Sequence, residues 1–356
     1  MKFTALPVNV GDSFLLQTGN KVILVDGGQN KSHILKLLAS ENIKNNHIDL
    51  LICTHYDADH INGIIGIIKS KKFTFTEIWL PEILGSIGYT ISKKLYSLLE
   101  TLRDTNFNEE INIESFYSEY EISKISSEAK ENNSFEKIDN DMLNDFIKNY
   151  QYFHHRRWYY HIHNNTEHKM IRNMYNISFL IHNSLNTGAY IKWFRYQNKR
   201  THISYGFDMF CENSIQTDIT LYDEQVFSKM LYLTTLTEIN KKSLVFMYKN
   251  DNCPNILFTA DSDLNFYLTS ITLKDNSIVT APHHGSSAND NAYSKIGGKD
   301  LIFVRSDRSQ IKRPGIGYLA QTNRYCTICR NITTKQKIEL IYNGNIFQIH
   351  ANICQC

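Results

Sequence analysis

The stretch Ile48-Asp49-Leu50-Leu51-Ile52-Cys53-Thr54-His55-Tyr56-Asp57-Ala58-Asp59-His60 decides the fold of this chain. An apolar run typical of a buried strand ends at Cys53, and two imidazoles and two carboxylates follow between His55 and His60. These side chains suit a divalent metal ion better than a packed core, because without a cation they would repel one another and be costly to desolvate. The alternative interpretation is a solvated polar loop.

Composition is that of an ordinary soluble globular protein. Of the 356 residues, 42% are hydrophobic and 21% are charged. A net charge of +2 gives no global attraction to nucleic acid or to membranes. No apolar run reaches the ~18 residues of a membrane span, and residues 1–7 lack the apolar core of a signal peptide. We therefore expect a cytoplasmic protein with no membrane partner.

Strand-type and helix-type segments alternate through the first 80 residues. Apolar strand-type runs cover 14–16, 22–25 and 77–80, and helical patterns start at 32 and span 61–68. This alternation predicts a layered α/β fold whose N-terminal half is residues 1–85. Further strand-type runs place the C-terminal half at residues 231–356: 243–247, 255–259, 278–281, 301–304 and 338–342.

Residues 86–230 differ from both halves, and we interpret them as an inserted, partly helical subdomain. Residues 104–141 hold eleven Asp and Glu against three Lys, a net −8, which is typical of a solvated face. Residues 150–205 hold eight Lys and Arg against one Glu, a net +7. Within them Arg156 and Arg157 stand among histidines and aromatic residues, a mixture that can neutralise phosphates and stack on bases. The favoured alternative is that they dock the insertion onto the main domain or a protein partner.

Seven cysteines in an apparently cytosolic protein indicate thiols or a metal rather than disulfides. Cys53, Cys211 and Cys253 are scattered and typical of small core residues. The other four form two close pairs near the C-terminus: Cys326, Cys329, Cys354 and Cys356. Together they could supply four thiolates to a structural Zn²⁺. The alternative is two unrelated pairs of free thiols.

Two further polar groups follow predicted strands in the C-terminal half. Asp261 comes directly after one strand, and His283 and His284 follow the next. Taken alone, Asp261 could be a helix cap and the histidine pair a surface turn. Loops at the same edge of stacked sheets converge in space, however, so we expect these groups to meet the loop from His55 to His60.

The ordered set of motifs resembles that of the metallo-β-lactamase fold superfamily, in which short metal-binding motifs follow successive strands of an αββα sandwich. Its closest likeness is to the hydrolase domain of ComEC-type competence proteins and their free-standing relatives. The residues that carry the resemblance are 9–16, 26–28, 55–60, 238–245, 258–261 and 282–286. It covers roughly residues 1–83 and 231–345, so the insertion is outside it.

The resemblance implies a role for each matching residue. The metal ligands would be His55, Asp57, Asp59, His60, Asp261 and His283, with Asp261 bridging two ions. Asp26 would brace the loop. Asp59 would also orient a hydroxide shared by the ions, and His284 would act in catalysis, as a further ligand or as a hydrogen-bond donor to the leaving group or a phosphate.

Departures from the family pattern bear on the metal. Asp57 stands where the family has histidine, so one or two ions of either Zn²⁺ or the harder Mn²⁺ or Mg²⁺ fit the donors. The histidine that many members supply before the bridging aspartate has no clear counterpart here. Arg313 replaces the histidine of a late Gly-His-Pro motif and could clamp a phosphate.

The leading functional hypothesis is a metal-dependent phosphodiesterase or nuclease that acts on nucleic acid or a nucleotide through a metal-bound hydroxide. One alternative is a hydrolase of a non-nucleotide ester, lactone or amide. Another is a catalytically degenerate binding or regulatory subunit, for example of a bacterial defence complex.

Overall fold

The computed structural model describes residues 1–85, 176–177, 179–219, 242–308, 313–329 and 335–356. The chain divides into two compact units. The larger unit comprises Met1–Ile83, Asn183–Ile219 and Glu238–Cys356, and everything below concerns this unit. The smaller comprises Leu84–His182 and Thr220–Thr237, most of which lies outside the described residues.

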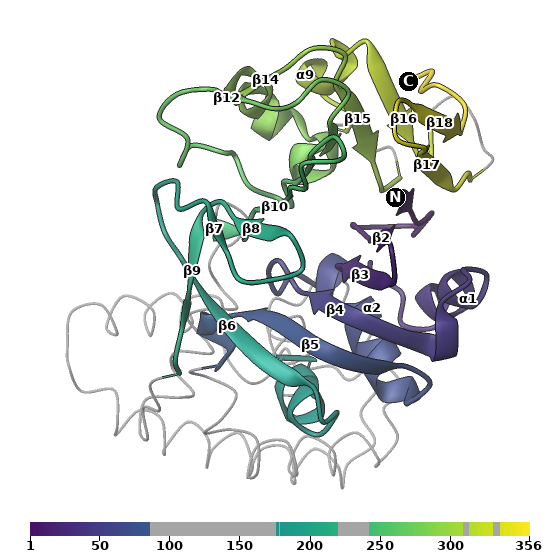
Figure 1. Ribbon diagram of the computed structural model, residues 1–356, viewed down its shortest axis with the longest axis vertical. Helices are drawn as coiled ribbons and strands as arrows, with labels where there is room; N and C mark the ends of the chain where they lie inside the picture. The colour runs from purple at the N-terminus through teal and green to yellow at the C-terminus, as the bar shows by residue number, and fades with distance from the viewer. Residues whose placement is uncertain (86–175, 178, 220–241, 309–312, 330–334) are drawn as a thin grey trace, which may run out of the picture. The chain divides into compact units, whose positions relative to one another are not determined.

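The larger unit contains two mixed sheets (Figure 1). In spatial order the first sheet consists of β18 (Phe347–His350), β17 (Ile338–Tyr342), β1 (Lys2–Ala5), β2 (Phe14–Thr18), β3 (Lys21–Val25), β4 (His47–Ile52), β5 (Thr74–Pro81), β6 (Tyr190–Tyr196) and β9 (Ser214–Thr217). Its neighbours from β3 to β6 are parallel, and the other pairs are antiparallel.

In spatial order the second sheet consists of β16 (Asn323–Cys326), β15 (Ile302–Arg305), β13 (Ile278–Thr280), β11 (Ile256–Phe258), β10 (Phe246–Tyr248), β8 (Met209–Cys211) and β7 (Ile203–Ser204). The four strands β11, β13, β15 and β16 run parallel. A small separate ladder pairs β12 (Ile271–Thr272) with β14 (Ile296–Gly297). The predicted α/β sandwich of metallo-β-lactamase type is confirmed by this architecture.

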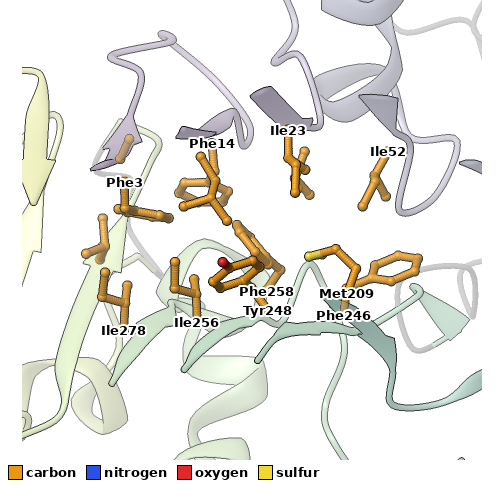
Figure 2. Packing of buried hydrophobic residues seen from close by; sticks show 14 of the residues in the cluster. Phe3, Phe14, Ile23, Ile52, Met209, Phe246, Tyr248, Ile256, Phe258 and Ile278 are labelled. Atoms are coloured by element: carbon orange, nitrogen blue, oxygen red, sulfur yellow. The ribbon is translucent and has the colours of Figure 1, made fainter. Parts of the chain in front are cut away.

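The hydrophobic core lies between the two sheets (Figure 2). Side chains from the first sheet, such as Phe14 and Ile52, point toward Phe246 and Phe258 of the second. Phe14 and Phe258 have ring centroids 6.2 Å apart. Leu51 faces away from this core yet is also fully buried, because both faces of a parallel sheet are covered in layered α/β folds.

The helices of the larger unit include α1 (His33–Ala39), α2 (Ala58–Ser70) and α9 (Ile316–Leu319). Short 3₁₀ segments cover Lys44–Asn46, Pro282–Gly285 and Ser287–Lys295. Helix α2 begins after Asp57, whose extended backbone ends the loop, and it stops where Lys71 adopts a left-handed conformation. The predicted helix over 61–68 is therefore present and longer at both ends.

One side of α2 touches the loop after β3 backbone to backbone. The amide of Gly63 donates to the carbonyl of Gly28 at 2.8 Å, and the amide of Gly27 donates to the carbonyl of His60 at 2.9 Å. A Cβ on Gly63 would lie 1.8 Å from the carbonyl oxygen of Gly27, so no larger residue fits. This contact fixes the start of α2, and with it His60, against β3.

The expected insertion overlaps the sandwich. Residues 86–175 lie outside the described part of the chain, but β6, β9, β8 and β7 come from 190–217 and extend both sheets. The boundaries proposed for the insertion stay a prediction. Within the described residues, no helix has the length and apolar character needed to cross a membrane.

Candidate metal centre

The candidate site lies where parallel strands of both sheets end. In the first sheet β3 leads to Asp26 and β4 leads to His55 and His60. In the second sheet β11 leads to Asp261, and β13 leads to the turn that holds His284. The carboxyl ends of parallel strands meet at one edge of a sheet, so this topology gathers the polar side chains.

Several residues of these loops have left-handed backbone conformations. Positive φ angles occur at Asp26 (57°), Ala260 (47°), His283 (47°) and His284 (53°), none of which is glycine. Such a conformation costs of order 1–3 kcal/mol per residue, and it persists only where the surrounding structure enforces it. Backbone strain of this kind is typical of functional sites, where the placement of side chains decides the backbone conformation.

Asp261 stands at the centre, and its two carboxylate oxygens face different histidines. Oδ1 lies 3.4 Å from His60 Nε2 and 3.2 Å from His284 Nε2. Oδ2 lies 3.8 Å from His55 Nε2 and 3.4 Å from His283 Nε2. One carboxylate therefore separates two pairs of imidazole nitrogens, an arrangement that suits two neighbouring cations sharing one ligand.

Two further carboxylates orient the deepest histidines. His60 Nδ1 lies 2.8 Å from Asp26 Oδ2, and His284 Nδ1 lies 3.0 Å from Asp12 Oδ1. A carboxylate only accepts, so Nδ1 of each imidazole is the donor. The two Nε2 atoms then turn toward Asp261 and lie 3.3 Å from each other. Carboxylate-oriented imidazoles of this kind are the usual support of metal-binding histidines.

Asp26 also holds the loop that follows β4. Its Oδ1 accepts from the amide of Thr54 at 2.9 Å, and its Oδ2 accepts from the Thr54 hydroxyl at 2.7 Å. Asp26 thus contacts both Thr54, next to His55, and His60 itself. These contacts are the ones that a bracing role for Asp26 requires.

Two buried polar atoms of the site lack a hydrogen-bond partner in the described part of the chain. They are His55 Nε2 and Asp12 Oδ2. A buried polar atom without a partner costs free energy that a divalent cation would recover. Asp12, His60, Asp261 and His284 also each offer a ligand atom within 4.8 Å of the others. The donor set therefore fits a divalent ion bound by imidazole nitrogen and carboxylate oxygen.

Without a cation, protons compensate the carboxylates. Burial alone would lower the pKa of His60 and of His284, but the surrounding carboxylates outweigh it and raise both pKa values well above the usual range. The dominant partners are Asp26 for His60 and Asp261 for His284. Burial lowers the pKa of His55, with the nearby His60 charge acting in the same direction. The carboxylates therefore favour protonated imidazole at His60 and at His284 in the metal-free site.

Metal binding should therefore release protons. Imidazoles must be neutral to ligate, and the carboxylates that raise the pKa of His60 and of His284 favour the protonated forms that a metal ion displaces. We expect protons to be released when the site fills, and the apparent affinity to fall as pH falls. Calorimetric titration of metal-free protein in two buffers of different ionisation enthalpy measures this release. A binding enthalpy independent of the buffer would contradict it.

Replacing Asp12 with Asn should weaken metal binding by roughly 10- to 100-fold, the usual effect of removing a partner of a ligating histidine. The amide cannot supply the negative charge that fixes the Nδ1 proton of His284. Competition with a chelating dye measures the affinity. Asp49→Asn is the matched control, because Asp49 accepts a backbone amide, that of Val22 at 2.8 Å, away from the site. Equal affinity in both variants would show that Asp12 does not support the site.

The remaining predicted residues lie at different distances from this centre. Asp59 Oδ2 is 3.4 Å from His284 Nε2, and Asp57 immediately precedes α2 and acts electrostatically on His55. The Arg313 guanidinium donates to the buried Asp307 at 3.0 Å, so it is held by an ion pair. Arg156 and Arg157 lie outside the described residues.

Asp12 is the member of the cluster that sequence reasoning missed. It lies in the segment 9–16 that carries part of the family resemblance, but the resemblance was not used to give it a role. In the structure Asp12 is 1% exposed and faces His284. The signal available in the sequence was an aspartate two residues before the apolar run that forms β2.

Part of this chain matches a protein family, and the chain is also similar to two curated proteins and to a solved structure. Residues 6–111 match the model of the metallo-beta-lactamase superfamily. Two strains of Streptococcus pneumoniae, D39 and R6, each have an exodeoxyribonuclease WalJ that is 41% identical over 61 residues. That match covers 17% of this chain, and the chain spans 22% of the length of these curated relatives.

A solved structure is also similar: the crystal structure of the metallo-beta-lactamase fold protein YhfI from Bacillus subtilis. The alignment covers 95% of this chain and 99% of YhfI, at 10% identity and a TM-score of 0.37.

Proposed function

We infer that this chain, whose fold is that of the metallo-beta-lactamase superfamily, is a metal-dependent phosphodiesterase or nuclease. The observation that carries the inference is the position of Asp261, whose two oxygens face separate pairs of imidazoles. A carboxylate shared by two cations is the arrangement that two-metal hydrolases use to act on a phosphodiester.

The residues would divide between two ions. His60 and His284 would serve one, with Asp59 beside them, and His55, His283 and Asp57 would serve the other. His284 Nε2 lies next to His60 Nε2, which favours a ligating role for His284 over contact with the leaving group. Bound ions would polarise the scissile group and lower the pKa of a bound water toward neutrality.

The mixed donor set bears on the choice of metal. Imidazole nitrogens suit Zn²⁺, whereas the carboxylates of Asp57 and Asp59 bring in harder oxygen ligands that Mn²⁺ accepts readily. We propose Zn²⁺ or Mn²⁺ as the native ions. Elemental analysis of the protein purified from its own host, set beside activity after reloading with each ion, distinguishes the two.

Two observations support a phosphate-containing substrate. The segments of the chain that resemble ComEC-type hydrolase domains include residues 9–16 and 282–286, and both line the centre through Asp12 and His284. The local similarity to an exodeoxyribonuclease agrees with this class, although it covers only 61 residues.

The test compares substrates under one set of conditions. Purified full-length protein with Mn²⁺ or Zn²⁺ is assayed on DNA, RNA, a cyclic nucleotide and a chromogenic carboxylic ester. We expect phosphodiester cleavage that a chelator abolishes and that Asp59→Asn lowers sharply, while Asp263→Asn leaves it unchanged. Turnover of the ester alone would replace the proposal with the ester, lactone or amide hydrolase. Absence of both activities and of metal at the site would replace it with a binding or regulatory subunit.

A further inference from the structure

The four C-terminal cysteines converge in the layer outside the second sheet. Cys326 ends β16, Cys329 follows it, and Cys354 and Cys356 come after β18. Cys354 Sγ lies 2.9 Å from Cys326 Sγ and 3.7 Å from Cys329 Sγ, and Cys329 Sγ lies 3.1 Å from Cys356 Sγ. A tetrahedron of Zn–S bonds of about 2.3 Å has sulfurs about 3.8 Å apart. The sulfurs of Cys326, Cys354 and Cys356 all lie within 4.8 Å of one another, and Cys329 Sγ is close to two of them, so a local adjustment that brings Cys329 closer to Cys326 gives a zinc site.

Backbone donors point at the sulfurs. The amide of Gln355 donates to Cys329 Sγ at 3.1 Å, and the amide of Cys356 donates to Cys354 Sγ at 3.4 Å. Such hydrogen bonds stabilise negative charge on sulfur and are part of the support of thiolate–metal centres. These N–H···S hydrogen bonds would add little stability to a pair of disulfides, because a disulfide sulfur is a weak acceptor.

A buried cation stands beside the cluster. The Arg305 side chain is fully buried, and its guanidinium donates to the carbonyls of Arg308 at 3.2 Å and Ile328 at 3.1 Å. Ile328 lies between Cys326 and Cys329 in the chain, so this contact places the guanidinium beside the cluster. A buried guanidinium needs neighbouring negative charge, and a thiolate cluster supplies it.

We propose that Cys326, Cys329, Cys354 and Cys356 bind one structural Zn²⁺ as thiolates, with Arg305 as the adjacent counter-charge. Four thiolates and one Zn²⁺ carry a net charge of −2, which Arg305 halves. This site is separate from the Asp/His centre, and it does not depend on the proposed hydrolase function.

The thiolate site also supports the turn that holds His284. A Cβ on Gly285, whose φ is +74°, would lie 3.1 Å from Arg305 Cδ and 3.5 Å from Tyr318 Cβ. Cys326 Sγ in turn lies 3.5 Å from Tyr318 Oη. The turn from Pro282 to Gly285 therefore packs on two side chains that both contact the cysteine cluster, and loss of the thiolate-bound metal should loosen it.

Cobalt substitution and elemental analysis of the full-length protein test the site. Co²⁺ should give the thiolate-to-metal charge-transfer bands and strong visible bands of tetrahedral tetrathiolate coordination. In an Asp261→Asn background, which removes the other centre, one equivalent of zinc should remain. Adding Cys354→Ser should remove it, and adding Cys253→Ser, a nearly buried cysteine outside the cluster, should not.

Three outcomes would overturn the proposal. One is a wild-type cobalt spectrum without thiolate bands, a result that needs no variant and so is unaffected by misfolding. Another is an intact mass and peptide map that show Cys326 joined to Cys354 in a disulfide under reducing purification. The third is iron in place of zinc in the Asp261→Asn protein.

Arg305→Met tests the counter-charge. It should weaken thiolate-bound Co²⁺ by at least tenfold in competition with a chelator, whereas Arg308→Met, at an exposed position, should not. Equal affinity in the two variants would remove Arg305 from the site.

Discussion

Asp261→Asn protein should lose its active-site metal and its hydrolytic activity. The loss should exceed the roughly 10- to 100-fold that removing a partner of a metal ligand costs, because Asp261 itself faces all four imidazoles. The amide offers one oxygen to one pair of histidines and turns an NH₂ group toward the other. It also removes a charge that, with that of Asp26, raises the pKa of His60 in the metal-free protein.

Mn²⁺ loading and phosphodiesterase activity measure the effect. Mn²⁺ is the useful ion because thiolates bind it weakly, so the cysteine cluster does not add to the signal. Asp263→Asn is the matched control: it lies two residues along the same loop, half-exposed, and its carboxylate accepts only from Asn265 in the contacts seen there. If the Asp261→Asn protein kept its Mn²⁺ and its activity, the two-cation interpretation of the site would be wrong.

Gly63→Ala should destabilise the protein by about 3 kcal/mol, the upper range for overpacking a core position. In an ordinary exposed helix the same change stabilises by roughly 0.5–1 kcal/mol. Here the new Cβ would meet the Gly27 carbonyl oxygen at 1.8 Å, so α2 must move away from the loop after β3. His60 moves with α2, and metal affinity should fall together with stability.

Denaturant unfolding of the metal-free protein measures the loss in free energy, and chelator competition measures the metal affinity. Lys69→Ala, on the exposed side of the same helix, should change the free energy of unfolding by less than about 0.5 kcal/mol. A Gly63→Ala protein that matched the Lys69→Ala protein in both measurements would show that α2 can shift without cost.

Most of the strands and helices could be predicted from the local spacing of apolar residues in the sequence. The apolar run that ends at Cys53 is β4, and the isoleucines after Asp59 form α2, because each pattern matches the spacing of one buried face. Strand β6, from Tyr190 to Tyr196, lies within the range that the sequence analysis proposes for the insertion. Its burial does not alternate, and Lys192 and Arg195 interrupt its apolar residues, so no period marks it as a strand.

Some residues of the candidate site could likewise be predicted from the sequence, and others could not. His55, His60 and Asp261 follow strand ends and could be selected from the sequence. Asp12 could not be paired with His284, since the two are 272 residues apart and only the packing of the two sheets brings them together. Arg305 is a similar case: nothing in its local sequence shows that it becomes fully buried beside Cys326.

The distance along the chain between Asp12 and His284 has a consequence during synthesis. When strands β1 to β5 have left the ribosome, His55 and His60 have been made, but Asp261, His283 and His284 are still untranslated. No metal pocket can close until β11 and β13 have left the exit tunnel and the second sheet has docked. If the chain cleaves nucleic acid as proposed, this order keeps the growing polypeptide inert beside the messenger RNA and ribosomal RNA that surround it.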